Sequence, residues 1–168
     1  MAGTRERPSS GSVAEVLRTV VALFVGAALM IGACALVGTA VAVRATLENF
    51  GPELTGIVMA AFSVGFIAGT VAGPHLIDRV GHIRTFAAGS AVASSLTIAF
   101  GLHVDPLTWI VLRILMGFCV AGLYMVIESW LNGASTAATR GRLFSIYMVV
   151  NLASLAGGQP LLQLAPPP

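Results

Sequence analysis

The sequence contains no lysine and little charge of either sign. All nine basic residues are arginines, seven residues are acidic, and only 10% of the 168 residues are charged. A soluble domain usually carries about 25% charged residues. The arginines stand singly between apolar stretches, which excludes the clustered basic face that a nucleic-acid-binding protein presents. The scarcity of charge therefore predicts a membrane protein with no nucleic-acid partner.

Cysteine is equally rare. The two cysteines, Cys34 and Cys119, lie inside separate apolar stretches. This placement argues against a disulfide framework. We expect both thiols to pack as small hydrophobic side chains.

The sequence also lacks a group of residues for catalysis inside a membrane. Such an enzyme needs a nucleophile with a base, a pair of carboxylates or a metal cluster at membrane depth. The acidic residue closest to an apolar stretch, Glu128, stands at its end, and the histidines stand at the edges of such stretches. We therefore expect no enzymatic activity, no metal and no cofactor.

Apolar stretches fill most of the chain. Hydrophobic residues make up 57% of it, and the mean hydropathy is +0.91. A polar tail at 1–18 and a proline-rich end at 165–168 flank five stretches of about 20 residues, enough to cross a bilayer. Because backbone groups in hydrocarbon must pair internally, each stretch should be a helix. The sequence thus predicts an all-α membrane protein with spans at about 19–43, 54–73, 83–102, 107–128 and 143–164.

The arginines predict the orientation of these helices. The connections are short, so consecutive helices should be antiparallel neighbours. Seven arginines then fall on the side of the N-terminus, and one, Arg44, falls on the opposite side. Arginine in short loops marks the cytoplasmic side. We expect a multi-pass protein of the inner (plasma) membrane with its N-terminus in the cytoplasm.

The connection after the second stretch carries a motif. Residues 73–84 read Gly-Pro-His-Leu-Ile-Asp-Arg-Val-Gly-His-Ile-Arg, which resembles the cytoplasmic signature loop of the major facilitator superfamily, G-x-L-x-D-R-x-G-R-R. A proline replaces the first glycine of the pattern, and its two final basic residues are replaced by one arginine a place later. The resemblance implies an inner latch that breaks and remakes during transport; the alternative is a solvated turn. The residues concerned are Leu76, Asp78, Arg79, Gly81 and Arg84.

A single charge lies within the fourth stretch. Arg113 stands about seven residues inside it, with Gly117 one turn further on, and the pair resembles the R-x-x-x-G signature of helix four in the same family. A charge in hydrocarbon costs at least ~2.5 kcal/mol and normally faces the bundle interior or a wet cavity. Alternatively, the side chain snorkels to the outer interface, about 10 Å away. We consider Arg113, Asn151 and Arg44 as candidates for a substrate or proton pathway.

A more specific resemblance covers most of residues 20–160. The run Gly-Leu-Tyr-Met-Val-Ile-Glu-Ser-Trp-Leu-Asn at 122–132 resembles the YcaD-like subgroup of these transporters. Glu128 ends the fourth predicted span, on the side of Arg140 and Arg142. Opposite charges at one membrane face form charge-assisted hydrogen bonds. We therefore expect an ion pair between Glu128 and an arginine of this side.

The resemblance implies a secondary transporter that moves an unidentified small solute by alternating access around a midplane site. Five helices resemble an incomplete N-terminal half of that fold, and the Ala-Pro-Pro-Pro ending leads us to expect a truncated product. The implied partners are the lipid bilayer, a small-molecule substrate, and the missing C-terminal half or a second copy. The alternatives are a small membrane-embedded interaction or assembly protein, or a non-functional transporter fragment.

Overall fold

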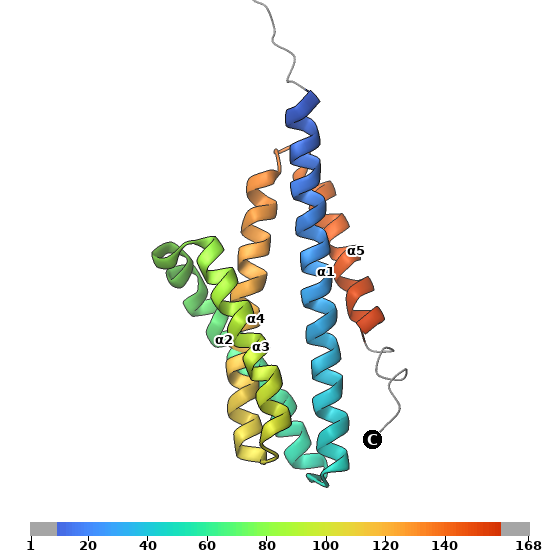
Figure 1. The fold of residues 1–168 in the computed structure, drawn as a ribbon, viewed down its shortest axis with the longest axis vertical. Coiled ribbons are helices and arrows are strands. Elements are labelled where there is room, and N and C mark those ends of the chain that lie inside the picture. The colour runs from blue at the N-terminus through green and yellow to red at the C-terminus, as the bar shows by residue number, and fades with distance from the viewer. Residues whose placement is uncertain (1–9, 159–168) are drawn as a thin grey trace, which may run out of the picture.

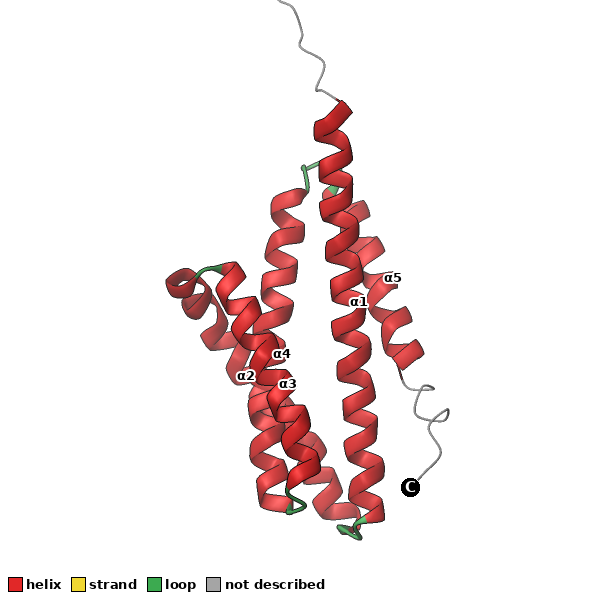
Figure 2. Ribbon diagram, in the orientation of Figure 1, coloured by secondary structure: helices red, strands yellow, loops and turns green. Residues whose placement is uncertain are grey.

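The structure, a computed structural model, describes residues 10–158, with side chains for 18 and 20–158. These residues form five helices joined by short loops, and no strand occurs among them (Figures 1 and 2). The helices are α1 (Ser10–Leu47), α2 (Gly51–Val80), α3 (His82–Leu102), α4 (Pro106–Ala134) and α5 (Arg140–Gly158). The predicted all-α fold is confirmed.

Four of the helices, α1 to α4, are long and apolar enough to cross a membrane. The described part of the fifth predicted span, α5, is 19 residues long and less apolar than the others, and it does not reach that standard. Residues 159–164 of this predicted span, and the proline-rich end, lie outside the described residues. The structure therefore supports four spans directly.

Several helices extend beyond the predicted spans, most clearly at the start of α1 and the end of α2. α1 begins at Ser10, inside the predicted polar tail, because adding turns to an existing helix costs far less than nucleating one. α2 continues through Pro74 to Val80, and the residue that caps it, Gly81, has φ +89° and ψ 154°. A proline is tolerated inside membrane helices, whereas this backbone conformation is almost confined to glycine.

The helices pack as two unequal groups. α2 and α3 pack mainly against α4, and α1 packs mainly against α5 (Figure 1). The N-terminal end of α1, the α2–α3 turn and the α4–α5 connection lie toward one end of the bundle, which we call the inner end. The other two connections lie toward the opposite, outer end. This alternation confirms that consecutive helices are antiparallel.

Glycines bring α2 and α4 into backbone contact. Gly65 faces the carbonyl group of Ile114, and Gly117 faces the backbone of Phe62, so closely that a Cβ atom at either glycine would overlap the opposite chain. At Gly69, a Cβ atom would lie 2.7 Å from the carbonyl oxygen of Phe118. Small residues at regular spacing are the usual means by which membrane helices approach closely. The α2–α4 pair is thus the tightest part of the bundle.

Trp109 organises the outer end. It is 1% exposed, and its Nε1 donates a hydrogen bond to the carbonyl oxygen of His103 at 2.8 Å. Its ring lies 5.0 Å from the ring of Phe50 and 5.8 Å from that of Phe100, centroid to centroid. Asp105 caps α4 beside it by accepting a hydrogen bond from the backbone N–H of Thr108 at 2.8 Å. The beginnings of α2 and α4 and the end of α3 are therefore tied together.

Candidate functional site

Arg113 is buried inside the bundle. Its side chain is 5% exposed. The neighbouring residues of α4 are apolar. Nη2 donates to the sulfur of Met59 at 3.7 Å, and the guanidinium carbon lies 5.0 Å from the centroid of the Phe62 ring. Nε is buried and has no hydrogen-bond partner. The side chain is thus buried and packs against α2.

The spacing of Arg113 and Gly117 explains this contact. One turn after Arg113, the missing side chain of Gly117 lets the backbone of α2 approach at Phe62 and Phe66. That approach places the face of the Phe62 ring and the thioether of Met59 against the guanidinium. Both groups attract a cation weakly, by the ring quadrupole and by sulfur polarisability. The local sequence therefore builds an apolar, cation-tolerant niche.

No carboxylate neutralises Arg113 among residues 20–158. The single ion pair in this part of the chain joins Arg44 Nε to Glu48 Oε1 at 3.2 Å, at the outer end of α1. The other described carboxylates lie on exposed or half-buried positions near helix ends, at Glu53, Asp78, Asp105 and Glu128. A buried charge without a partner costs several kcal/mol (order of magnitude) after relaxation. The buried guanidinium of Arg113 therefore lowers the stability of the folded chain.

Arg113 borders a cavity of about 380 Å³ between α1, α3 and α4, with Phe62 contributed by α2. Cys34, Ser90, Ser94 and Thr97 supply its other polar groups. The hydroxyls of Ser94 and Thr97 donate hydrogen bonds to carbonyl oxygens of their own helix at 2.9 Å. Arg113 is therefore the one cation among the residues that line the cavity.

The candidates Arg44 and Asn151 lie apart from this cavity. Arg44 lines a smaller outer cavity of about 160 Å³, which shares Val37 and Thr97 with the Arg113 cavity. Asn151 of α5 is half-buried and lies next to the hydroxyl group of Tyr124. The structure therefore links Arg44 to Arg113 through shared lining residues, and Asn151 is not among the residues that line either cavity.

The motif between α2 and α3 forms a tight, exposed turn. The charged residues of the motif are exposed, and Leu76 is 41% exposed. Gly81 makes the turn possible: its N–H donates to the carbonyl oxygen of Ile77 at 2.8 Å, and its own carbonyl accepts from Thr85 Oγ1 at 2.9 Å. Asp78, Arg79 and Arg84 form no ion pair within the described part of the chain. Their side chains are free to meet another surface.

The predicted ion pair of Glu128 is wrong for this structure. Glu128 is exposed, and no arginine among residues 18 and 20–158 lies within ion-pair distance of it. α4 continues for six residues beyond Glu128 to Ala134, about 9 Å of helix rise. Arg140 and Arg142 begin α5 beyond the following loop, where Arg140 Nε donates to Ser135 Oγ at 3.4 Å. The inner ends of α3 and α4 are joined instead by a hydrogen bond between His82 Nε2 and Ser129 Oγ at 2.8 Å.

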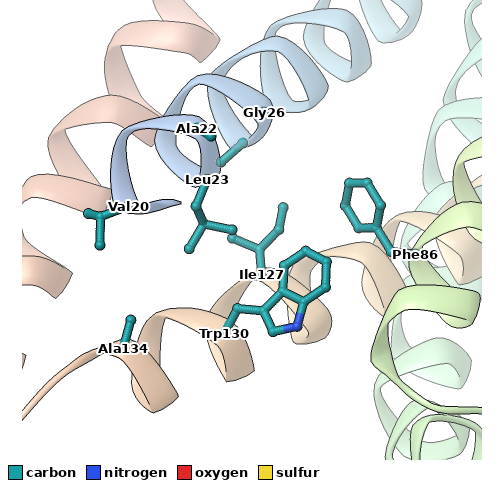
Figure 3. Close-up of a pocket in the computed structure, with 9 residues that line it drawn as sticks. Val20, Ala22, Leu23, Gly26, Phe86, Ile127, Trp130 and Ala134 are labelled. Carbon is teal, nitrogen blue, oxygen red and sulfur yellow. The ribbon is translucent and has the colours of Figure 1, made fainter. Parts of the chain in front are cut away.

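Sequence reasoning missed two features of the inner half. A larger, mainly apolar cavity of about 590 Å³ lies between α1 and α4, with Leu23, Phe86, Ile127 and Trp130 in its lining (Figure 3). The hydroxyl oxygen of Tyr147 in α5 is buried without a hydrogen-bond partner. Both depend on which helix faces meet, and no local pattern in the sequence signals that.

Comparison with known proteins gives the family. The family model of the Major Facilitator Superfamily matches residues 23–164. An uncharacterised MFS-type transporter of Enterobacter sp. (strain 638) is 30% identical over 149 residues, covering 89% of this chain and 39% of that protein. The uncharacterised MFS-type transporter YcaD of Escherichia coli O45:K1 (strain S88 / ExPEC) is 28% identical over 144 residues, covering 86% of this chain and 38% of that protein.

The chain thus spans about two fifths of the length of these curated relatives. No solved structure matches it. The relatives confirm the YcaD-like resemblance, and the matched region includes the motif after α2, Arg113 and Gly117. With four helices that can span a membrane, this chain is a multi-pass membrane protein that belongs to the major facilitator superfamily.

Proposed function

We propose that this chain forms part of a secondary transporter that moves a small solute by alternating access, with the Arg113 cavity as part of its solute site. The observation that carries the proposal is a buried, unneutralised guanidinium at the wall of a 380 Å³ cavity. Ionisable residues at membrane depth are expensive and normally mark a substrate or ion pathway. Arg113 lies seven residues into α4, about 10 Å from its outer end.

The turn between α2 and α3 is assigned the role of inner latch. Gly81 fixes a sharp turn, and Asp78, Arg79 and Arg84 present unpaired charges on it. Such charges can make and break charge-assisted hydrogen bonds with a second surface as the protein changes state. Since this chain spans about two fifths of its relatives, that surface and the transport cycle belong to the whole transporter. Family membership favours this role over an interaction or assembly role.

The inner end is proposed to face the cytoplasm. It carries exposed Arg18, Arg79, Arg84, Arg140 and Arg142, whereas the outer end carries Arg44 within residues 18–158. Positive residues in short loops are retained on the cytoplasmic side. This bias supports our proposal that the protein lies in the inner (plasma) membrane with its N-terminus in the cytoplasm.

The test is transport by a full-length relative in proteoliposomes. YcaD of Escherichia coli would be reconstituted, and currents would be recorded against a panel of organic anions, organic cations and sugars. We expect at least one class to give a signal. Replacing by Gln the residue of YcaD that aligns with Arg113 should reduce that signal more than about tenfold, as loss of a charge-assisted contact implies. An unchanged signal in this variant contradicts the assignment of the site.

A further inference from the structure

We infer that the Arg113 cavity binds an organic anion with a carboxylate or similar planar oxyanion head and a compact apolar body. The inference rests on the proposed function and names its substrate class. Two independent observations support it. One is a guanidinium that lacks a counter-charge, and the other is a lining that is mainly apolar.

The guanidinium has unused hydrogen-bond donors. Nη2 donates only to the sulfur of Met59, a weak acceptor, and Nε is buried without a partner. Along α4, Asp105 lies eight residues before Arg113 and Glu128 fifteen residues after it, or about 12 Å and 22 Å by helix rise. Neither carboxylate can form a close pair with it. A planar oxyanion fits the fork of donors in two parallel hydrogen bonds.

The charge excludes other solute classes. A cation in this cavity would be repelled by Arg113 with no anion among residues 20–158 to offset it. A sugar needs many hydrogen-bond donors and acceptors, yet Ser94 and Thr97 already donate to their own helix. A neutral solute would leave the guanidinium uncompensated, which keeps the full cost of the buried charge. An anion alone removes that cost on binding.

The remaining lining sets the body of the solute. It consists mainly of aliphatic, thioether and aromatic side chains, among them Met30, Val37, Phe62, Met116 and Leu123. A volume of about 380 Å³ lies at the lower end of the range for small-molecule pockets, about 300–1,000 Å³. A small aromatic or branched aliphatic acid matches both the size and the polarity. Large amphiphiles do not.

Arg44 gives the anion a route from the outer end. The outer cavity that Arg44 lines shares Val37 and Thr97 with the Arg113 cavity. Arg44 is half-exposed and paired to Glu48 at 3.2 Å, so that an incoming anion can exchange with the Glu48 carboxylate. A cation at the entrance of a cleft attracts anions electrostatically. Arg44 would thus bind the anion weakly at the outer end before it reaches Arg113.

Cys34 provides a direct test, because it lines the Arg113 cavity whereas Cys119 does not. In a Cys119→Ala background, Cys34 is the only thiol of the chain. The chain in liposomes would be treated with a sulfonate-bearing or a trimethylammonium-bearing methanethiosulfonate. Each reagent forms a mixed disulfide with the thiolate and releases methanesulfinate. We expect the anionic reagent to modify Cys34 about tenfold faster or more, relative to their rates with a free thiol.

The charge variants decide the cause of this preference. Arg113→Gln should bring the two relative rates together, Arg113→Lys should retain the preference, and the exposed control Arg18→Gln should leave it unchanged. Sodium benzoate should slow the modification of Cys34, whereas benzamide and benzylamine at equal concentration should not. Equal rates for the two reagents, or a preference that survives Arg113→Gln, overturn the inference.

If Cys34 is too buried to react with either reagent, a second measurement tests the inference. Benzoate should raise the Tm of the detergent-solubilised chain in proportion to the logarithm of its concentration, and benzamide should not. Arg113→Gln should abolish the shift, while its own Tm shows that it folds. No shift with benzoate up to 100 mM, combined with an unreactive Cys34, overturns the inference. Transport of cations or sugars alone by the full-length relative leaves the proposed function standing and removes only the anion class.

Discussion

Gly117 of α4 and Phe62 of α2 are in backbone contact, such that a Cβ atom at position 117 would overlap the Phe62 carbonyl group. Together with the contacts of Gly65 and Gly69, this contact limits how far α2 can rotate and slide along α4. It also presents the Phe62 ring to the guanidinium of Arg113 at 5.0 Å. Helix packing and the environment of the buried charge are therefore set by the same glycine.

Gly117→Ala should destabilise the bundle. Overpacking a close contact costs about 1–3 kcal/mol, and the atoms it would meet are backbone, which cannot move aside alone. Gly122→Ala is the matched control, because it lies on the same helix and its Cβ atom would meet nothing within 4 Å. Thermal unfolding in detergent should show a lower Tm for the first variant only. Equal Tm values would mean that α2 and α4 are not in backbone contact.

Arg113→Met should stabilise the chain while removing its anion site. Replacing a buried ion pair by apolar side chains of similar volume is often neutral or stabilising by about 1–4 kcal/mol, and Arg113 has no ion-pair partner to lose among residues 20–158. Arg44→Met is the control; Arg44 is exposed and makes an i,i+4 pair worth about 0.3–0.5 kcal/mol. Chemical denaturation in mixed micelles measures both. A strong loss of stability in Arg113→Met would show that the guanidinium holds the bundle together.

Gly81→Ala should impair the turn between α2 and α3. Its φ of +89° and ψ of 154° lie in a region that costs other residues about 1–3 kcal/mol. Gly101→Ala, on α3, is the control, because it has open space around its Cβ position and an ordinary φ. Limited proteolysis at the inner end, together with the Tm, should separate the two variants. Equal protection would place the turn in a different conformation.

Asp105 should make the outer end sensitive to acid. The backbone hydrogen bond from Thr108 lowers the pKa of the Asp105 carboxyl below its ordinary value of 3.8. A lowered pKa in the folded state means that the stabilisation is present above 3.8 and is lost as the pH falls through the folded value. In a Trp130→Phe background, the emission of Trp109 should therefore change below pH 4. Asp105→Ser keeps a capping oxygen without titrating, so its emission should stay constant over the same range.

The orientation can be tested with single cysteines. In a background without Cys34 and Cys119, a membrane-impermeant maleimide added outside intact cells should label cysteine at Asn49 or Asp105. It should not label cysteine at His82 or Ala137 until the cells are opened, because these positions lie at the inner end. Outside labelling at either inner position would reverse the proposed orientation.

The sequence predicted what local patterns determine. Apolar runs of sufficient length located the helices. A single arginine within such a run, one turn before Gly117, indicated a buried charge, because exposing a charged side chain to lipid is costly. The fourth span is predicted to end at about 128, and the helix that contains it continues to Ala134. The proposed partner of Glu128 depended on that boundary. Met59 and Phe62 were missed because the register between α2 and α4 is a tertiary property.

The two tryptophans lie at opposite ends of the bundle, so that their fluorescence can report on each end. Trp109 is enclosed by Phe50 and Phe100 at the outer end, whereas Trp130 borders the inner cavity beside Phe86, 5.6 Å away between ring centroids (Figure 3). The chain has no other tryptophan. With Trp109→Phe or Trp130→Phe, the remaining indole becomes a native fluorophore for one end of the bundle alone. Quenching by aqueous iodide then reports separately when each end admits water, without any attached dye.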